Sequence, residues 1–481
     1  MLDLRPVGYV VGWLVAVLGL TMALPMAADM IAGNDHWIVF LECGVITFLI
    51  GTAVALATAN SIGPRPSVQQ TFLLTTGVWL ALPMFAALPF YLGSTGASYT
   101  DAFFEAMSGL TTTGATVMVG LEELPKGLLL WRALLQWFGG IGIIVVAMVF
   151  LPELRIGGMQ IFRSEGFDTL GKILPRASEI AQQISVIYAS LTVVCALSYA
   201  ASGMNGFDAM THAMTTVATG GFANYDASFA AFPPAVEYVA VVFMVLAALP
   251  FVRYVQLLAG SAAPLYVDGQ VRTFLGVAFL VVVLLAAARV WVDGDLENSV
   301  RQSLFNGVSI LTGTGYASTD YTLWGAFPVA VIFFIGLIGG CAGSTSCSIK
   351  IFRYQLLFSS IRAQIRRIHS PHGLFTPRYA GRVVSNDVLS SVMAFFVFFI
   401  VTLGVLSVLL ALTGLDFVTS ISGASAALAN IGPGLGDEIG PAGNYNGLGD
   451  TAKWLLAAAM LIGRLELLVV YAVLTRHFWR A

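Results

Sequence analysis

Long apolar runs separated by polar connections recur along the whole chain. Each of ten such runs is long enough to cross the roughly 30 Å hydrocarbon core of a bilayer. They lie near residues 8–31, 38–59, 71–92, 128–150, 184–203, 235–257, 273–293, 327–348, 389–413 and 452–475. The first run is too long for the apolar region of a signal peptide, so we interpret it as a retained span. The pattern predicts a multi-pass membrane protein whose two termini lie on the same side.

The composition strengthens this prediction. Of the 481 residues, 58% are hydrophobic and only 10% are charged, whereas about 25% are charged in an ordinary soluble domain. These values exclude a soluble enzyme, a disordered chain and a protein that binds nucleic acid through a basic face. The sequence shows no nucleophile–base or metal constellation, so we expect neither an enzyme nor a covalently bound cofactor. The four cysteines lack the spacing of a zinc site and are interpreted as packing residues: Cys43, Cys195, Cys341 and Cys347.

The few charged residues are unevenly distributed. Most basic residues fall in alternate connections and near the ends: Arg5, Arg65, Arg155, Arg163, Lys172, Arg176, Arg253, Arg272, Lys350, Arg353, Arg362, Arg366, Arg367, Arg378, Arg382, Arg476 and Arg480. Acidic residues populate the other connections: Asp101, Glu122, Glu123, Asp208, Asp226, Asp293, Asp295, Asp320, Asp437, Glu438 and Asp450. Because connections rich in Lys and Arg stay in the cytoplasm, both termini are predicted to be cytoplasmic.

Four acidic-side connections share an internal repeat. Each holds about a dozen apolar residues followed by a glycine turn, and these segments are 101–114, 207–220, 302–315 and 419–432. A dozen apolar residues are too few to span a bilayer and suit a re-entrant helix. The chain therefore reads as two N-terminal helices (1–60) and four units of span, short helix, turn and span, at 61–160, 161–262, 263–360 and 361–481. This predicts an all-α membrane protein with four pseudo-symmetric P-loop repeats around a central pore.

The four turns contain no ionisable side chain. They read TTTGAT (111–116), VATGGF (217–222), TGTGY (312–316) and NIGPG (430–434). Glycine allows the backbone to present successive carbonyl groups, and rings of carbonyls replace the hydration shell of a monovalent cation such as potassium. One acid follows each turn, and these four are expected to surround an outer mouth: Glu122, Asp226, Asp320 and Asp437. Turns that merely join packed helices are the alternative.

These residues resemble the Trk/Ktr/HKT superfamily of potassium transporters, and within it the bacterial TrkH/TrkG-type membrane subunit. The matching stretches include GLTTTGAT (109–116), TTVATGGFANYD (215–226), LTGTGYASTD (311–320), GGCAGSTSCSIKIFR (339–353) and ANIGPGLG (429–436). The resemblance implies potassium uptake across the bacterial inner membrane by channel-like permeation. It also implies a homodimer and gating by a cytoplasmic TrkA-type nucleotide-binding subunit.

The resemblance also assigns residues to a selectivity filter. They are Thr112, Thr113, Gly114 and Ala115; Ala218, Thr219, Gly220 and Gly221; Gly313, Thr314, Gly315 and Tyr316; and Asn430, Ile431, Gly432 and Pro433. Potassium is expected at Thr113, Thr219, Thr314 and Ile431. The fourth turn departs furthest from the others, because Ile431 replaces threonine and Pro433 follows the glycine. We therefore expect weaker discrimination of potassium from sodium than in a filter of four like turns.

A glycine-rich stretch, GGCAGSTSCSIK, interrupts the run at 327–348. Glycine costs a helix about 1 kcal/mol relative to alanine, so the stretch predicts a broken helix, with a glycine-rich packing face as the alternative. By resemblance it is an intramembrane gating loop whose residues are Gly339, Gly340, Gly343, Ser344, Thr345 and Ser346, with Arg464 as partner. Arginine within a span is costly and by default functional, although a purely structural role for Arg464 stays open. Ser346, Cys347 and Ser348 replace a commoner glycine run.

Three interpretations remain open from the sequence. A secondary symporter coupled to protons or sodium is the alternative function, but Glu42 and Glu466 are the only acids in the spans away from the outer mouth. The arginine-rich stretch 353–382 suits either the regulatory subunit or anionic membrane lipid. His212 is interpreted as a packed, hydrogen-bonded residue.

Overall fold

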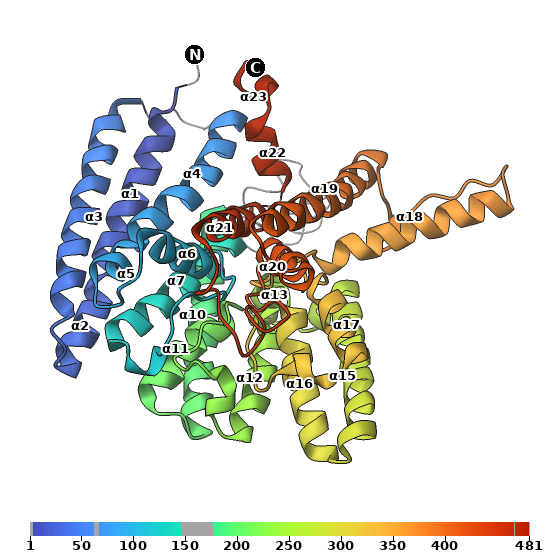
Figure 1. Cartoon of the computed structure of the whole chain (residues 1–481). Coiled ribbons are helices and arrows are strands. Elements are labelled where there is room, and N and C mark those ends of the chain that lie inside the picture. Colours follow the sequence, from blue (N-terminus) through green and yellow to red (C-terminus); the bar gives the residue numbers. More distant parts are fainter. Residues whose placement is uncertain (1–2, 62–66, 146–176, 466, 481) are drawn as a thin grey trace.

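The computed structural model describes residues 3–61, 67–145, 177–465 and 467–480, and Glu466 lies outside this part of the chain. The first two spans form a helix pair (Figure 1). α1 (Arg5–Thr21) continues into α2 (Ala23–Ala32), and α3 (Trp37–Thr58) packs against α1. The helices approach closely because glycines face backbone: a Cβ added at Gly12 would lie 2.6 Å from the Ala55 nitrogen, and one at Gly51 would lie 2.4 Å from the Ala16 nitrogen. Small residues of this kind are typical of helix contacts in membranes.

Four further groups of helices follow. The first contains α4 (Val68–Ala86), α5 (Leu88–Leu92), α6 (Tyr99–Leu110) and α7 (Lys126–Val145). The second contains α10 (Ala177–Ala201), α11 (Gly206–Val217), α12 (Pro234–Ala247) and α13 (Phe251–Leu258). The third contains α14 (Ala263–Val267), α15 (Gly269–Asp293), α16 (Leu296–Thr312), α17 (Ala326–Gly336) and α18 (Ile351–His369). The fourth contains the hairpin β1 (Arg378–Tyr379) and β2 (Arg382–Val383), then α19 (Asn386–Leu412), α20 (Phe417–Ala429), α21 (Asp450–Arg464), α22 (Leu468–Leu474) and α23 (Arg476–Arg480).

The predicted short helices are present in all four groups as α6, α11, α16 and α20. Each begins at a polar N-cap whose side chain accepts a backbone N–H of the first turn: Ser98, Asn205, Asp295 and Asp416. Such caps satisfy donors that a helix start leaves open. In the third group the cap at Asp295 starts the helix six residues before the expected position 302.

Three of the ten predicted spans are interrupted. Seven helical segments in the described part of the chain are long and apolar enough to cross a membrane, with α1 and α2 counted as one segment and α4 and α5 as another. α12 and α13 meet at 88°, because Pro250 has no N–H to continue the helix. α17 ends at Gly336, and residues 337–350 are not helical, which confirms the broken helix expected there. α21 and α22 meet at 111° after Arg464.

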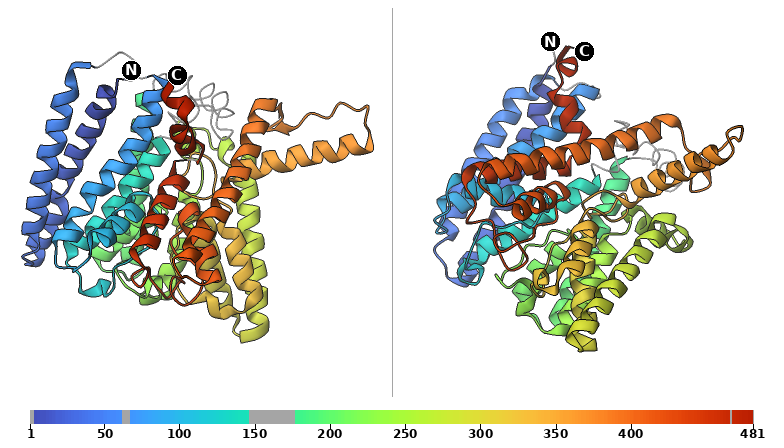
Figure 2. Two further views of the ribbon diagram at one scale, coloured as in Figure 1. Left: turned by 45° about the horizontal axis from the view of Figure 1, so that its top comes forward. Right: turned by 45° about the vertical axis from the view of Figure 1, so that its right-hand side comes forward.

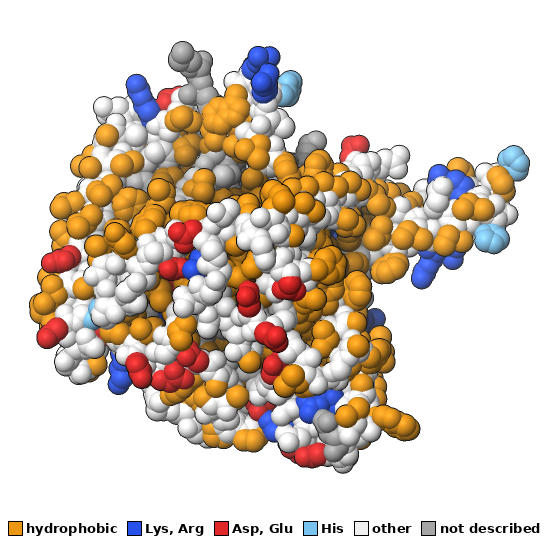
Figure 3. Space-filling view, viewed as in Figure 1, with side chains coloured by type: hydrophobic (Ala, Val, Ile, Leu, Met, Phe, Trp, Pro, Cys, Tyr) orange, Lys and Arg blue, Asp and Glu red, His pale blue; other side chains and the backbone are white. Residues whose placement is uncertain are grey.

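The views place both ends of the described chain at the same end of the helix bundle, and α18 projects outward as an arm that leads to the β-hairpin (Figures 1 and 2). In Figure 3 acidic side chains are scattered over the central loops, and Lys and Arg lie on the arm and near the termini, with others at the lower edge of the molecule. The charge separation predicted from the sequence is therefore visible on the folded surface.

Candidate functional site

The four turns that follow the short helices meet one another. Each places a glycine so close to the next turn that a side chain would collide with a carbonyl oxygen. A Cβ would lie 2.3 Å from the Gly220 oxygen at Gly114, 2.0 Å from the Thr314 oxygen at Gly221, 1.9 Å from the Ile431 oxygen at Gly315 and 2.8 Å from the Thr113 oxygen at Gly432. The contacts run from the first turn through the second, third and fourth and back to the first. The turns therefore form a closed ring.

Backbone geometry aligns the turns with one another. The short helix is followed by a residue of positive φ, namely Thr112, Thr219, Gly313 or Asn430. Two positions later stands a glycine of φ between +81° and +94°, namely Gly114, Gly221, Gly315 or Gly432. The residue between these two positions donates its N–H to the carbonyl five residues earlier. The donors are Thr113, Gly220, Thr314 and Ile431, and the distances are 2.8–3.0 Å.

This geometry corrects the register of the second repeat by one residue. Gly221, not Gly220, corresponds to Gly114, and Gly220, not Thr219, corresponds to Thr113. Two consecutive glycines made both registers compatible with the sequence. Gly220 therefore occupies in the second turn the backbone position that Thr113 occupies in the first.

A cavity of about 200 Å³ opens on one side of the ring. Its lining includes the four glycines Gly114, Gly221, Gly315 and Gly432. Of the four acids expected around an outer mouth, Asp226 lines this cavity, and Glu122, Asp320 and Asp437 are not in its lining. Instead, Glu122 accepts the backbone N–H of Asp226 at 3.0 Å, and Asp320 caps a short 3₁₀ helix at Tyr321–Trp324. The expected acidic ring is thus reduced to one carboxylate at the cavity.

The segment that follows each turn is held to the short helix by a hydrogen bond. A side chain of the helix accepts a backbone N–H of that segment. The acceptor side chain and the backbone N–H that it holds are Glu105 with Val117 (2.9 Å), His212 with Asn224 (3.3 Å), Asn306 with Ser318 (3.1 Å) and Ser422 with Leu435 (2.9 Å). In the first three repeats the acceptor stands seven residues before the residue of positive φ. In the fourth repeat that position is Gly423, and the preceding serine serves instead. His212 is packed and hydrogen-bonded, as the sequence predicts.

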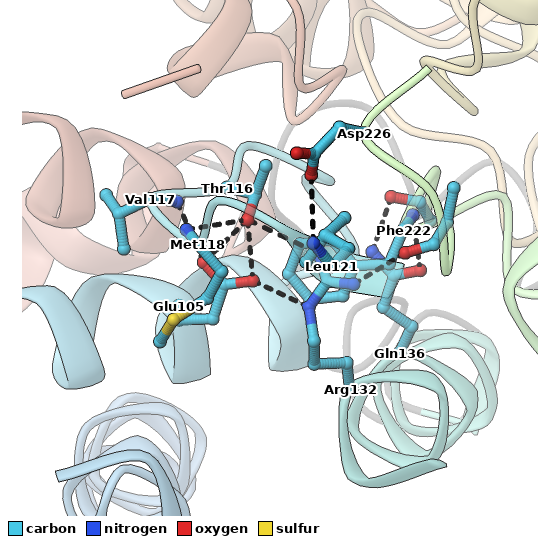
Figure 4. A network of polar contacts seen from close by, with 11 residues as sticks. Glu105, Thr116, Val117, Met118, Leu121, Arg132, Gln136, Phe222 and Asp226 are labelled. Atoms are coloured by element: carbon cyan, nitrogen blue, oxygen red, sulfur yellow. Dashed lines mark hydrogen bonds and ion pairs between the residues drawn. The ribbon is translucent and has the colours of Figure 1, made fainter. Parts of the chain in front are cut away.

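Side chains on α7 support the second turn from behind. The Gln136 amide donates to the Gly220 carbonyl at 2.5 Å and accepts the Phe222 N–H at 3.1 Å. One helical turn earlier, Arg132 donates to the Ala223 carbonyl at 2.6 Å and to Glu105 at 2.8 Å (Figure 4). Neither residue was predicted from the sequence to have a role. Their only signal is the spacing of two polar residues, four apart, in an apolar run.

The threonine hydroxyls of the turns are engaged in local hydrogen bonds. Thr113 Oγ1 lies 2.7 Å from Thr111 Oγ1 and accepts a bond from Asn430 Nδ2 at 3.0 Å. Thr314 Oγ1 lies 2.8 Å from Thr312 Oγ1. The phenol of Tyr316 points into the second repeat, with its oxygen 3.1 Å from Thr216 Oγ1. These side chains stiffen the ring.

The glycine-rich loop of residues 339–350 lies directly on the other side of the ring. Ser346 Oγ donates to the Thr312 carbonyl at 2.6 Å, and the Ser348 N–H donates to the Ala429 carbonyl at 3.0 Å. Cys347 Sγ lies 3.5 Å from Thr112 Oγ1. The loop therefore touches the C-terminal ends of three short helices, where unpaired carbonyls and the negative end of the helix dipole gather.

Arg464 holds this loop from the fourth repeat. Its guanidinium is 4% exposed, donates to Cys347 Sγ at 3.0 Å and to the Gly139 carbonyl at 2.9 Å. A small cavity beneath the loop, of about 40 Å³, is lined by Lys350, Arg353 and Arg464 among others. The positive charge at this point opposes a cation. Cys347, interpreted from the sequence as a packing residue, is in fact a contact between loop, ring and arginine.

The break between α12 and α13 supplies further partners for the loop. Because Pro250 interrupts the helix, the carbonyls of Ala247 and Ala248 are not used within it and instead accept bonds from Thr345 Oγ1 and the Cys341 N–H, both at 3.0 Å. The Phe251 N–H in turn donates to the Gly343 carbonyl at 2.9 Å. Pro250 within an apolar run is the sequence signal for this break.

A second ion pair ties α6 to α21 away from the ring. Lys453 Nζ lies 2.5 Å from Asp101 Oδ1, in the first turn of α6. Partial burial raises the pKa of Asp101, but hydrogen bonds from Lys453 and Ser98 outweigh burial, so that this pKa lies below its usual value. This pair stabilises helix packing without touching a turn.

Comparison with known proteins gives a consistent result. Residues 36–477 match the TrkH family, described as a cation transport protein. The Trk system potassium uptake protein TrkI of Halomonas elongata is 43% identical over 97% of this chain and 96% of its own. This chain belongs to the TrkH family. The Trk system potassium uptake protein TrkH of Escherichia coli K12 is 34% identical over 99% of both chains.

The TrkH-family fold agrees with a solved structure. The crystal structure of the potassium transporter TrkH from Vibrio parahaemolyticus matches with a TM-score of 0.91 at 33% identity and covers 100% of both chains. The match confirms the predicted fold class of four repeats plus two N-terminal helices. Relatives named as transport proteins also confirm that this TrkH-family chain is not an enzyme.

Proposed function

We propose that this protein takes up potassium across the bacterial inner membrane. The observation that carries the proposal is the closed ring of four turns, which joins the four repeats and contains no ionisable side chain. Relatives named as potassium uptake proteins support the choice of ion. A cation that leaves water must find replacement oxygens, and here the ring offers backbone carbonyls.

The ring acts as the selectivity filter. Its central residues are Thr113, Gly220, Thr314 and Ile431, each of which has its carbonyl oxygen beside the glycine of the adjoining turn. Because the threonine hydroxyls bond to neighbouring side chains, the carbonyl groups are the main ligands for the ion. Asp226 raises the cation concentration in the cavity above the ring.

The loop of residues 339–350 acts as the gate. It closes the path on the far side of the ring, and Arg464 adds a positive barrier at the same point. Its attachments are single hydrogen bonds to several different helices, which exchange at low cost when the loop moves. The conformation described here is closed by this criterion.

The termini and the arginine-rich arm lie in the cytoplasm. This orientation follows from the basic residues near the termini and on α18. α18 exposes apolar side chains such as Phe358, Ile365 and Ile368 beside its arginines. Such a mixed surface suits a second copy of the chain, a cytoplasmic TrkA-type nucleotide-binding subunit and anionic lipid headgroups at its rim, and we propose a homodimer regulated by that subunit.

Reconstitution in liposomes together with the regulatory subunit tests the proposal. Potassium and sodium currents are measured against an imposed voltage, with and without a proton gradient. We expect a current that reverses near the Nernst potential of potassium. A reversal potential that follows protons or sodium would instead establish symport, and absence of potassium flux would overturn the proposal.

A further inference from the structure

Glu105 and Arg132 form a buried ion pair beside the ring. Arg132 Nε lies 2.8 Å from Glu105 Oε1, and the two side chains are 2% and 0% exposed. Taking two charges out of water costs several kcal/mol per ion, so such a pair persists only with excellent geometry and further hydrogen bonds. The contacts of the pair show where that geometry is used.

The pair touches the first and second turns at corresponding positions. Glu105 accepts bonds from Thr116 Oγ1 and the Val117 N–H, both at 2.9 Å, just after the first glycine. Arg132 donates to the Ala223 carbonyl at 2.6 Å, two residues after Gly221. Figure 4 shows the carboxylate and the guanidinium lying between these two strands.

A contact between Arg132 and an aromatic side chain adds to the restraint on the second turn. The Arg132 guanidinium carbon lies 4.1 Å from the centre of the Phe222 ring. A planar guanidinium can stack on an aromatic ring and donate several bonds at once, which a lysine cannot reproduce. The contact between the first and second turns, here called the first seam, is therefore held by one ion pair that bonds to both turns.

The other turns are braced by neutral groups. Asn306 holds Ser318 within the third repeat, and Ser422 holds Leu435 within the fourth. Those bonds join a turn to its own helix. Bonds from one repeat to the next also occur at other seams, but those of Asn430 with Thr113 and of Tyr316 with Thr216 join neutral groups, whereas the brace at the first seam is charged.

We propose that Glu105 and Arg132 are positioning residues that determine the discrimination between potassium and sodium. This rests on the proposed filter function. The pair fixes the separation of Gly114 and Gly221, and with it the carbonyls that an ion meets at this seam. Arg132 also lines the cavity above the ring, so Glu105 neutralises a positive charge that would otherwise repel entering cations.

The permeability ratio of potassium to sodium tests the proposal. It is obtained from the reversal potential with potassium on one side of a liposome membrane and sodium on the other, in the presence of the regulatory subunit, for wild type, E105Q and R132Q. This potential does not depend on how many molecules fold. We expect the ratio to fall about three- to tenfold in both variants, which lies in the lower part of the range of coupling found between residues in contact.

Two further variants separate position from charge. R132K keeps the positive charge but loses the planar guanidinium and its several N–H donors. Its permeability ratio should therefore fall while its potassium current stays near that of wild type. E105Q/R132Q removes both charges, so its potassium current should exceed that of E105Q while its ratio stays low. R132K also provides a result if a neutral variant yields no current.

D101N is the matched control. It breaks the other ion pair of α6, with Lys453, which touches no turn, and it should keep the wild-type ratio. Wild-type ratios in E105Q, R132Q and R132K would overturn the positioning role, as would an equal fall in D101N. A wild type that conducts no potassium would overturn the proposed function instead, so the two failures are distinguishable.

Discussion

The ring of turns and the loop beneath it lie in contact, yet they are held in opposite ways. Each turn is built alike, with the same backbone bond, the same positive φ and a brace from its own helix. The loop occurs once, in the third repeat, and its bonds reach residues of the second and fourth repeats. The contrast indicates that the repeated bonds fix the distances between the turns, where an ion must fit. The loop, which is held by bonds to residues of other repeats, is freer to move.

The largest effect is expected from a side chain in the ring. Gly315→Asp places a Cβ within 2 Å of the Ile431 oxygen, at a φ that costs an L-residue roughly 1–2 kcal/mol, and adds a charge to a neutral path. Gly114→Asp should act alike. We expect loss of discrimination among monovalent cations, measured as rubidium, potassium and sodium flux in liposomes.

Gly414→Asp is the matched control for the ring. Gly414 has a φ of +96°, but a Cβ there meets nothing within 4 Å. It should retain selective flux. Normal selectivity in both ring variants would show that the turns do not contact the ion.

Shortening the loop tests the other half of the comparison. Deletion of residues 343–348 removes the contacts to Thr312 and Ala429. We expect potassium leak without any regulatory subunit, with the permeability ratio preserved because the ring keeps its own braces. Flux is measured in cells and in liposomes without the subunit. Low flux that still requires the subunit would place the gate elsewhere.

A smaller effect is expected from the arginine that holds the loop. Arg464→Gln removes the positive barrier and the bond to Cys347 Sγ. We expect basal potassium flux to rise roughly tenfold, which corresponds to about 1.4 kcal/mol. Arg464→Lys keeps the charge and should stay closer to wild type. Equal flux in all three proteins would assign Arg464 a purely structural role.

The smallest effect is expected at the thiol. Cys347→Ser replaces the sulfur that accepts the Arg464 bond by an oxygen on a shorter side chain, and should change basal flux by about two- to threefold, as for a net hydrogen-bond change below 1 kcal/mol. Cys195→Ser, at a buried cysteine in α10, is the control and should leave basal flux unchanged. A change in permeability ratio in Cys347→Ser would mean that ring and loop are not separable.

The sequence predicted the elements that repeat and missed the side-chain pairs that hold them in place. Four apolar segments that end in glycine were sufficient to predict the short helices and the turns. The stretch GGCAG was sufficient to predict that the span containing α17 is broken. The predicted alignment of the second turn was off by one residue, because Gly220 and Gly221 are both glycine and the sequence alone does not distinguish them. The division of the chain into units stays a prediction. The Glu105–Arg132 pair was missed because a partner 27 residues away leaves no periodic signal.

The closure of the ring has a consequence for how the protein is made. Asn430 bonds to Thr113 across 317 residues of chain, and Gly432 completes the last contact of the circle. During synthesis the first three turns enter the membrane well before their final neighbour exists, and domains generally fold as the chain emerges. A growing chain therefore lacks the closed ring until its fourth turn has been made, when translation has nearly finished.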